Sequence, residues 1–115
     1  MSPRNRHRRA SERQADAPVF AALGDPTRLA LVARLSRGQP YSISQLTEGS
    51  RLTRQAVTKH LRVLEGVGIV HSARAGRESI YKFDPQPIEE LKQYLDLVSK
   101  QWDDALDRLK SFVES

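Results

Sequence analysis

The segment RLTRQAVTKHLRVLEGVG, residues 51–68, constrains the fold most, because its apolar and polar side chains separate at helical spacing. On a helical wheel of about 100° per residue, Val57, Leu61 and Leu64 fall within about 60° of one another. The residues that extend this apolar side are Ala56, His60, Val63 and Val67, and those opposite are Gln55, Thr58, Lys59 and Arg62. The sequence therefore predicts a helix with one buried face and one polar, basic face.

Three shorter helices are predicted to precede this segment. Their expected N-terminal residues are Asp16 with Pro18 in the first turn, Asp25 with Pro26, and Ser42. The side chains expected to face inward are Val19, Phe20 and Leu23, then Leu29, Leu31, Val32 and Leu35, then Ile43 and Leu46. Thr53 would cap the helix over residues 53–66, and Gly66 or Gly68 would end it. A turn at Gly49 joins the last two helices, which is typical of a helix-turn-helix.

A hairpin is predicted to follow, from about residue 69 to residue 83. In IVHSARAGRESIYKFD, β-branched and aromatic residues flank Ala75 and Gly76. Arg74 and Arg77 would lie at the tip of this hairpin, while Ile80, Tyr81 and Phe83 would anchor it to the core. A hairpin directly after a helix-turn-helix is a wing, and arginines beside its turn suit phosphate contact or minor-groove insertion.

The last segment, about residues 87–114, is predicted to be one long amphipathic helix. Its apolar residues follow alternating steps of three and four and form a heptad seam: Ile88, Leu91, Leu95, Val98, Trp102, Ala105, Leu109 and Phe112. A helix of this length spans about 40 Å, longer than a domain of this size needs to cover its own core. We therefore expect a homodimer interface shared with Val19 and Phe20, although the helix folding back on its own domain remains the alternative.

The charge of the chain is unevenly placed. The net charge is +5, and residues 51–82 hold seven basic side chains against two acidic ones. Residues 87–115 reverse the sign, with four basic and seven acidic side chains. This asymmetry is expected of a protein that binds a polyanion, which includes nucleic acids and membrane surfaces.

Other features limit the class of protein. At 115 residues the chain fits one domain, and it has no cysteine, so disulfides and thiolate metal sites are absent. No apolar run approaches the ~18 residues of a membrane span, and we expect a soluble, cytoplasmic protein without a membrane partner. Residues 1–15 are polar and basic and are predicted to be a disordered N-terminal arm, either a simple solvated tail or one that lies along DNA.

Catalysis is not predicted. Ser42, Ser44 and His60 have no carboxylate partner, nucleophile elbow or oxyanion loop at a recognisable spacing. The chain also has no Gly-rich phosphate loop. We expect no enzymatic activity and no cofactor.

Taken together, LGDPTRLALVARL, then LTRQAVTKHLRVLEGVGIV, the wing and the long last helix resemble the ArsR family of dimeric winged-helix transcriptional repressors. The resemblance covers residues 17–115. It implies a homodimer that binds an inverted-repeat operator and is released by a signal.

The chain departs from the metal-sensing members of this family. Where those sensors carry Cys-x-Cys, the run YSISQL has Ser42 and Ser44, and serine hydroxyls are poor ligands for soft metals. The second family site uses His on the last helix, and residues 87–115 contain none. His60 is interpreted as a buried, hydrogen-bonded side chain. We therefore predict no metal site.

The predicted fold is mainly α with a β wing: a winged helix-turn-helix domain, residues 16–115, with a long C-terminal dimerisation helix. The predicted function is sequence-specific binding of double-stranded DNA, most consistent with a homodimeric repressor and an unidentified inducer. The predicted DNA-binding residues are Arg51, Thr53, Arg54, Gln55, Thr58, Lys59, Arg62, Arg74 and Arg77, and the predicted dimer interface is Val19, Phe20, Leu91, Leu95, Val98, Trp102, Ala105, Leu109 and Phe112. The alternative is a winged-helix protein-interaction or RNA-binding module, although the polar face and the narrow major groove of RNA favour DNA.

Overall fold

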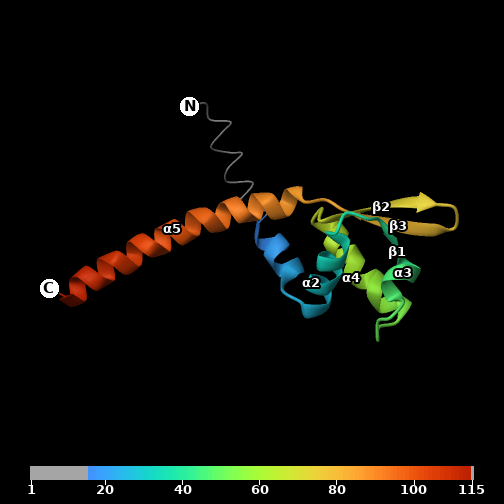
Figure 1. The fold of residues 1–115 in the computed structure, drawn as a ribbon, viewed down its shortest axis with the longest axis horizontal. Coiled ribbons are helices and arrows are strands. Elements are labelled where there is room, and N and C mark those ends of the chain that lie inside the picture. The colour runs from blue at the N-terminus through green and yellow to red at the C-terminus, as the bar shows by residue number, and fades with distance from the viewer. Residues whose placement is uncertain (1–15, 115) are drawn as a thin grey trace, which may run out of the picture.

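The computed structural model describes residues 16–114. The predicted basic arm, residues 1–15, lies outside the described residues. After helical residues 16–23, the elements are α2 (Pro26–Leu35), β1 (Tyr41–Ser42), α3 (Ile43–Thr47), α4 (Arg54–Gly66), β2 (Val70–Ala75), β3 (Glu78–Phe83) and α5 (Gln86–Glu114). This order confirms the predicted winged helix-turn-helix fold with a long C-terminal helix (Figure 1).

Short-range hydrogen bonds begin the helices, as the sequence predicts. The Asp25 carboxylate accepts from the backbone N–H of Arg28 at 2.9 Å, and the Thr53 hydroxyl accepts from that of Ala56 at 3.1 Å. Ser42 caps α3 in a reciprocal capping box with Gln45. One predicted cap is wrong, because Asp16 is itself helical rather than the residue before its helix.

The core lies between α2, α3, α4 and the sheet. Val57, Leu61 and Leu64 of α4 are fully buried, which confirms the predicted inner face. Three residues expected to face inward do not, and one of them is Phe20, which is 39% exposed. Leu29 is 52% exposed and Val63 is 41% exposed, because α2 and α4 pack on the sides that carry Leu35 and Leu61. A helix on the surface of a small domain is covered over only part of its circumference.

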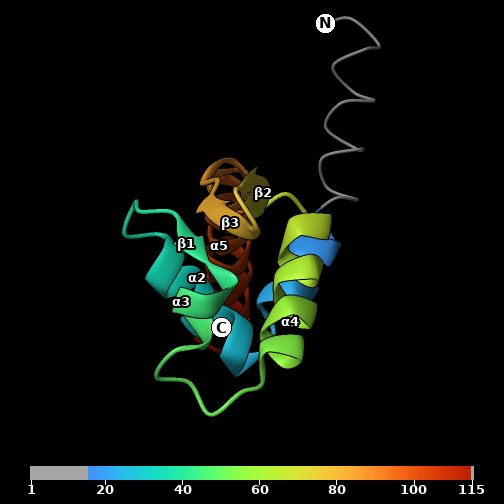
Figure 2. The same cartoon turned by 90° about the vertical axis from the view of Figure 1, so that its right-hand side faces the viewer.

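The sheet has three antiparallel strands in the order β1-β3-β2. β2 and β3 form the predicted wing, with Ala75 opposite Glu78 at its end and Gly76 in the turn at a φ of 66°. That backbone conformation favours glycine. β1 was not predicted, since two residues are too short to show an alternating pattern; it pairs Tyr41 with Tyr81. Figure 2 shows α3 and α4 side by side, with the hairpin at one end of the pair.

α5 leaves the rest of the molecule after its first turns. Ile88 and Leu91 pack on the core, and Leu91 is buried. Beyond them the helix runs outward as a single rod (Figure 1). The radius of gyration is 18.8 Å, well above the ~13 Å expected of a compact domain of this length. The described chain therefore does not fold this helix back on its own domain.

Candidate nucleic-acid interface

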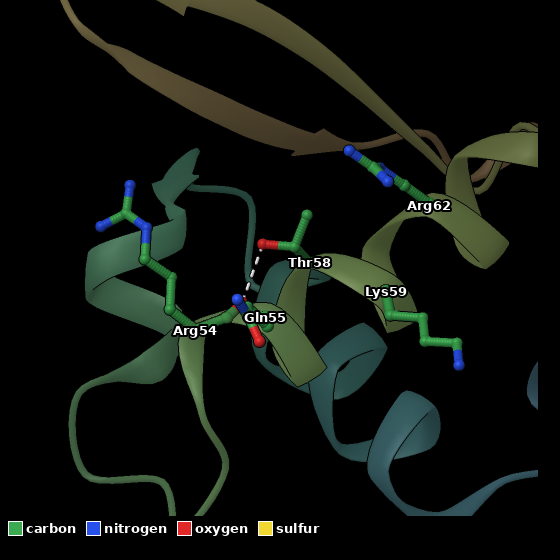
Figure 3. Close-up of a pocket in the computed structure, with 5 residues that line it drawn as sticks. All are labelled: Arg54, Gln55, Thr58, Lys59 and Arg62. Atoms are coloured by element: carbon green, nitrogen blue, oxygen red, sulfur yellow. Dashed lines mark hydrogen bonds between the residues drawn. The ribbon is translucent and has the colours of Figure 1, made fainter.

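The outer face of α4 forms an open hollow of about 470 Å³. Its lining consists of Arg54, Gln55, Thr58, Lys59 and Arg62, the residues that the sequence places opposite the apolar face together with the first residue of the helix. Arg54 and Lys59 extend from the helix in opposite directions (Figure 3). The hollow therefore combines three cationic groups with an amide and a hydroxyl, the groups that contact phosphates and base edges.

Thr58 and Gln55 differ in whether their polar groups already form hydrogen bonds within the chain. The Thr58 hydroxyl donates to the backbone oxygen of Arg54 at 2.8 Å, the bond drawn in Figure 3. Its only hydroxyl proton is therefore used, while its methyl group and the lone pairs of the hydroxyl oxygen remain for contact. Within residues 16–114 the exposed Gln55 amide makes no hydrogen bond, so both its donor and its acceptor are available.

Arg54 is tied to two other elements. Its Nη1 donates to the hydroxyl of Ser44 in α3 at 2.8 Å, and that hydroxyl donates to the Glu78 carboxylate in β3, also at 2.8 Å. No sequence pattern predicts this chain of bonds, because Ser44 and Glu78 are 34 residues apart. It joins the helix-turn-helix to the wing.

The wing arginines and the residues before α4 lie on the surface. Arg74 is exposed near the end of β2, opposite Ser79, and Arg77 is exposed in the turn. Arg51 is exposed in the connection between α3 and α4. Thr53 differs from these, because its hydroxyl is engaged as the N-cap of α4.

His60 is held by a guanidinium. Nη1 of Arg28 lies 3.3 Å from Nδ1 of His60, and since arginine only donates, Nδ1 is the acceptor. The same guanidinium donates to the backbone oxygens of Ala21 and Ala22, at the end of the helix over residues 16–23. The predicted hydrogen bonding of His60 is confirmed, but its predicted burial is only partial, because 23% of the side chain is exposed. Its partner Arg28 was not predicted.

A second histidine lies at the base of the wing. Nε2 of His71 is 2.8 Å from the Asp84 carboxylate. The pKa of Asp84 is lowered, first by a hydrogen bond from the backbone N–H of Gln86 and then by His71. Across residues 16–114 no group of three or more His, Cys, Asp or Glu is placed to hold a metal ion. None of the described helices is long and apolar enough to cross a membrane.

The heptad seam of α5 forms a second candidate surface. Along the outer part of the helix the exposed fractions are 45% for Leu95, 65% for Trp102, 58% for Leu109 and 79% for Phe112. Val19 and Leu91 are buried in the core of the chain itself, so the part of the predicted dimer surface that is open lies further along α5 and at Phe20. The Phe20 ring meets Tyr94 of α5 edge-on, with a centroid distance of 6.5 Å.

The chain is similar to known regulators over most of its length. Residues 23–73 match the model of a helix-turn-helix domain family. The HTH-type transcriptional regulator Rv2034 of Mycobacterium tuberculosis is 34% identical over 97 residues, which is 84% of this chain and 87% of that protein. The HTH-type transcriptional repressor SmtB of the same organism is 26% identical over 116 residues, 87% of this chain and 84% of that protein. Among solved structures, the ArsR-like transcriptional regulator from Rhodococcus sp. RHA1 superposes with a TM-score of 0.78 at 34% identity, covering 89% of this chain and 93% of that one.

Proposed function

Because the chain belongs to the ArsR family and is a DNA-binding transcriptional regulator, we propose that it is a homodimeric repressor that binds an inverted-repeat operator. The observation that carries this proposal is the division of α4, with Val57, Leu61 and Leu64 buried and a basic hollow on the opposite face. A recognition helix needs both faces, since one fixes it to the domain while the other enters the major groove.

The free groups of this hollow suggest separate roles. The open amide of Gln55 suits the bidentate hydrogen bonds that read adenine, and the Thr58 methyl suits the methyl group of thymine. Lys59 and Arg62, with Arg54 and Arg51, are assigned to phosphates beside the bases. Arg74 and Arg77 are assigned to the backbone or the minor groove beyond the helix. Thr53 is assigned an indirect role, because its side chain caps the start of α4.

The exposed seam of α5 supports the dimer. An apolar face of this extent on a chain of 115 residues calls for a partner, and a second copy presents an identical face. Two copies would place two α4 helices on a pseudo-palindromic site. The relative SmtB is named a transcriptional repressor, which favours repression over activation. Release by an unidentified inducer and a cytoplasmic location belong to the same proposal, which assigns the chain no catalytic activity.

Selection of bound duplexes from a random-sequence pool tests this function. We expect the wild-type protein to enrich an inverted repeat. Lys59→Ala should weaken binding to all duplexes and lower the slope of log affinity against log salt concentration by about 1 per half-site. Gln55→Ala should change the preferred base at particular positions, and so should Thr58→Ser, which removes the methyl group but keeps the hydroxyl, at about 1–3 kcal/mol each.

Lys100→Ala is the matched control, because Lys100 is an exposed lysine on α5, away from the hollow. Its affinity and salt slope should equal those of the wild type. Unchanged binding in Lys59→Ala, Gln55→Ala and Thr58→Ser together would remove this face from the interface. Enrichment of no duplex would favour the alternative of a protein-interaction or RNA-binding module.

A further inference from the structure

One hydroxyl connects three elements of the proposed interface. Ser44 is the second residue of α3, while Arg54 is the first residue of α4 and Glu78 the first of β3, directly after the turn of the wing. The Ser44 hydroxyl accepts from Arg54 at 2.8 Å and donates to Glu78 at 2.8 Å. The start of the recognition helix is thereby connected to the outer end of the wing.

The direction of these bonds is fixed by the chemistry of the three groups. A guanidinium only donates and an ionised carboxylate only accepts, so the single proton of Ser44 goes to Glu78 and a lone pair faces Arg54. In the part of the chain that the structure describes, Arg54 and Glu78 form no direct ion pair within 4.0 Å. The Ser44 hydroxyl is therefore the bridge between the two charges, and donation to Glu78 makes it a better acceptor for Arg54.

We propose that Ser44 and Glu78 are positioning residues that hold the Arg54 guanidinium in place for DNA and set the wing relative to α4. This inference rests on the proposed function, which assigns Arg54 to phosphate. Arginine is a long side chain, and one that is already ordered loses less rotamer freedom when DNA binds. Ser44 uses one N–H group of the guanidinium, and the others remain for a phosphate.

The two serines of YSISQL, Ser42 and Ser44, have different roles. The Ser42 hydroxyl caps α3 and is engaged with the backbone N–H of Gln45. The Ser44 hydroxyl does not cap the helix and is directed to Arg54 and Glu78. Replacing Ser42 would disturb the fold of α3, whereas replacing Ser44 removes a link between elements that each have their own core contacts.

A double-mutant cycle with Ser44→Ala and Arg54→Ala tests the inference. The probe is a short duplex selected by the wild-type protein from a random-sequence pool. Ser44→Ala should weaken binding by about three- to tenfold, which is comparable to the net contribution of one ordinary hydrogen bond. It should leave the salt slope unchanged, because Arg54 still reaches its phosphate, whereas Arg54→Ala should lower the slope by about 1 per half-site.

The decisive result is the effect of Ser44→Ala in the Arg54→Ala background. If Ser44 acts through Arg54, the second substitution should cause no further loss of affinity. Ser44→Thr keeps the hydroxyl, so in a chain that retains Arg54 it should bind the duplex with the affinity of the wild type. Ser36→Ala is the control, because among the described residues the hydroxyl of Ser36, which follows α2, bonds only to the backbone oxygen of Ala33. The same cycle with Glu78→Ala should show that Ser44→Ala costs less when the carboxylate is absent.

Equal losses from Ser44→Ala in both backgrounds would overturn the positioning role, as would wild-type affinity in Ser44→Ala while Arg54→Ala is weakened. Either result would leave the proposed operator binding intact. If the wild-type protein instead enriches no duplex, the proposed function itself fails. The two failures are therefore separated by the wild-type measurement.

Discussion

Asp25 shows how much one side chain at a helix start decides. Its carboxylate accepts from the backbone N–H of Arg28, and this hydrogen bond is the main cause that lowers the pKa of Asp25 below its ordinary value of 3.8. A carboxyl group whose pKa is lower in the folded state stabilises that state above the unfolded pKa. The stabilisation is lost as the pH falls through the folded pKa. The α2 cap is therefore sensitive to acid.

Asp25→Asn isolates this effect, because asparagine caps helices about as well as aspartate but carries no charge. Near neutral pH the wild type should unfold at the higher temperature, since a carboxylate makes the stronger hydrogen bond. Below pH 3.8 the two midpoints should converge. Thermal unfolding followed by circular dichroism across this range checks the prediction. A difference that persists in acid would mean that the charge of Asp25 is not the cause.

Two leucines of α2 test the boundary of the core. Leu35 is fully buried, and Leu35→Ala should lower the free energy of unfolding by about 2–5 kcal/mol. Leu29 is 52% exposed, so Leu29→Ala should change it by no more than about 0.5 kcal/mol. Urea unfolding at one fixed protein concentration makes the comparison. A large loss in Leu29→Ala would mean that Leu29 is covered, for instance by a second copy.

At the scale of elements, Arg28 connects three helices through hydrogen bonds. From α2 it donates to the last carbonyls of the helix over residues 16–23 and to His60 of α4. Orphan carbonyls at a helix end need such donors. The orientation of α4 therefore depends on a residue outside the helix-turn-helix.

The coupling between Arg28 and His60 is measurable in a double-mutant cycle. Arg28→Ala and His60→Ala should each destabilise the fold, and together less than the sum, with a coupling of about 0.5–3 kcal/mol. His60→Asn should retain part of the coupling, since the asparagine oxygen can replace Nδ1 as the acceptor. Urea unfolding supplies the free energies. Strict additivity would show that the 3.3 Å contact does not contribute.

These contacts also mark what could be predicted from the sequence. The caps at Asp25, Ser42 and Thr53 bond to N–H groups three residues away, so local patterns reveal them. The contact from Arg28 to His60 spans 32 residues. It depends on how the helices pack, which periodicity does not specify. Accordingly the helices, the hairpin and the outer face of α4 were predicted, while β1, Arg28, Glu78 and the bridging role of Ser44 were not.

At the scale of the whole molecule, α5 determines the shape. It has 29 residues and a rise of about 1.5 Å per residue, so it extends well beyond the domain that it starts from. Its outer apolar residues form a stripe, and near its end Leu106 and Val113 widen that stripe, at 58% and 72% exposed. Burying such a stripe in a second copy would turn an elongated chain into a compact dimer.

Trp102→Asp tests whether this stripe forms the dimer. Trp102 lies in the middle of the outer seam and is 65% exposed, so an aspartate there should not disturb the core of the chain. In a dimer, however, two carboxylates would be buried without partners. We expect a monomer by analytical ultracentrifugation, with wild-type helix content. Operator affinity should fall sharply, because the two half-sites would no longer be bound by linked domains.

Gln93→Asp is the matched control, since it adds the same charge to α5 on the side opposite the seam. It should remain dimeric and bind the selected duplex as the wild type does. If Trp102→Asp also remained dimeric, the interface would lie elsewhere and the exposed seam would need another partner. If Trp102→Asp were monomeric but bound the duplex with wild-type affinity, the dimer would exist without being required for DNA binding. If Trp102→Asp loses both the dimer and operator affinity, DNA binding through the hollow on α4 depends on dimerisation through the outer part of α5.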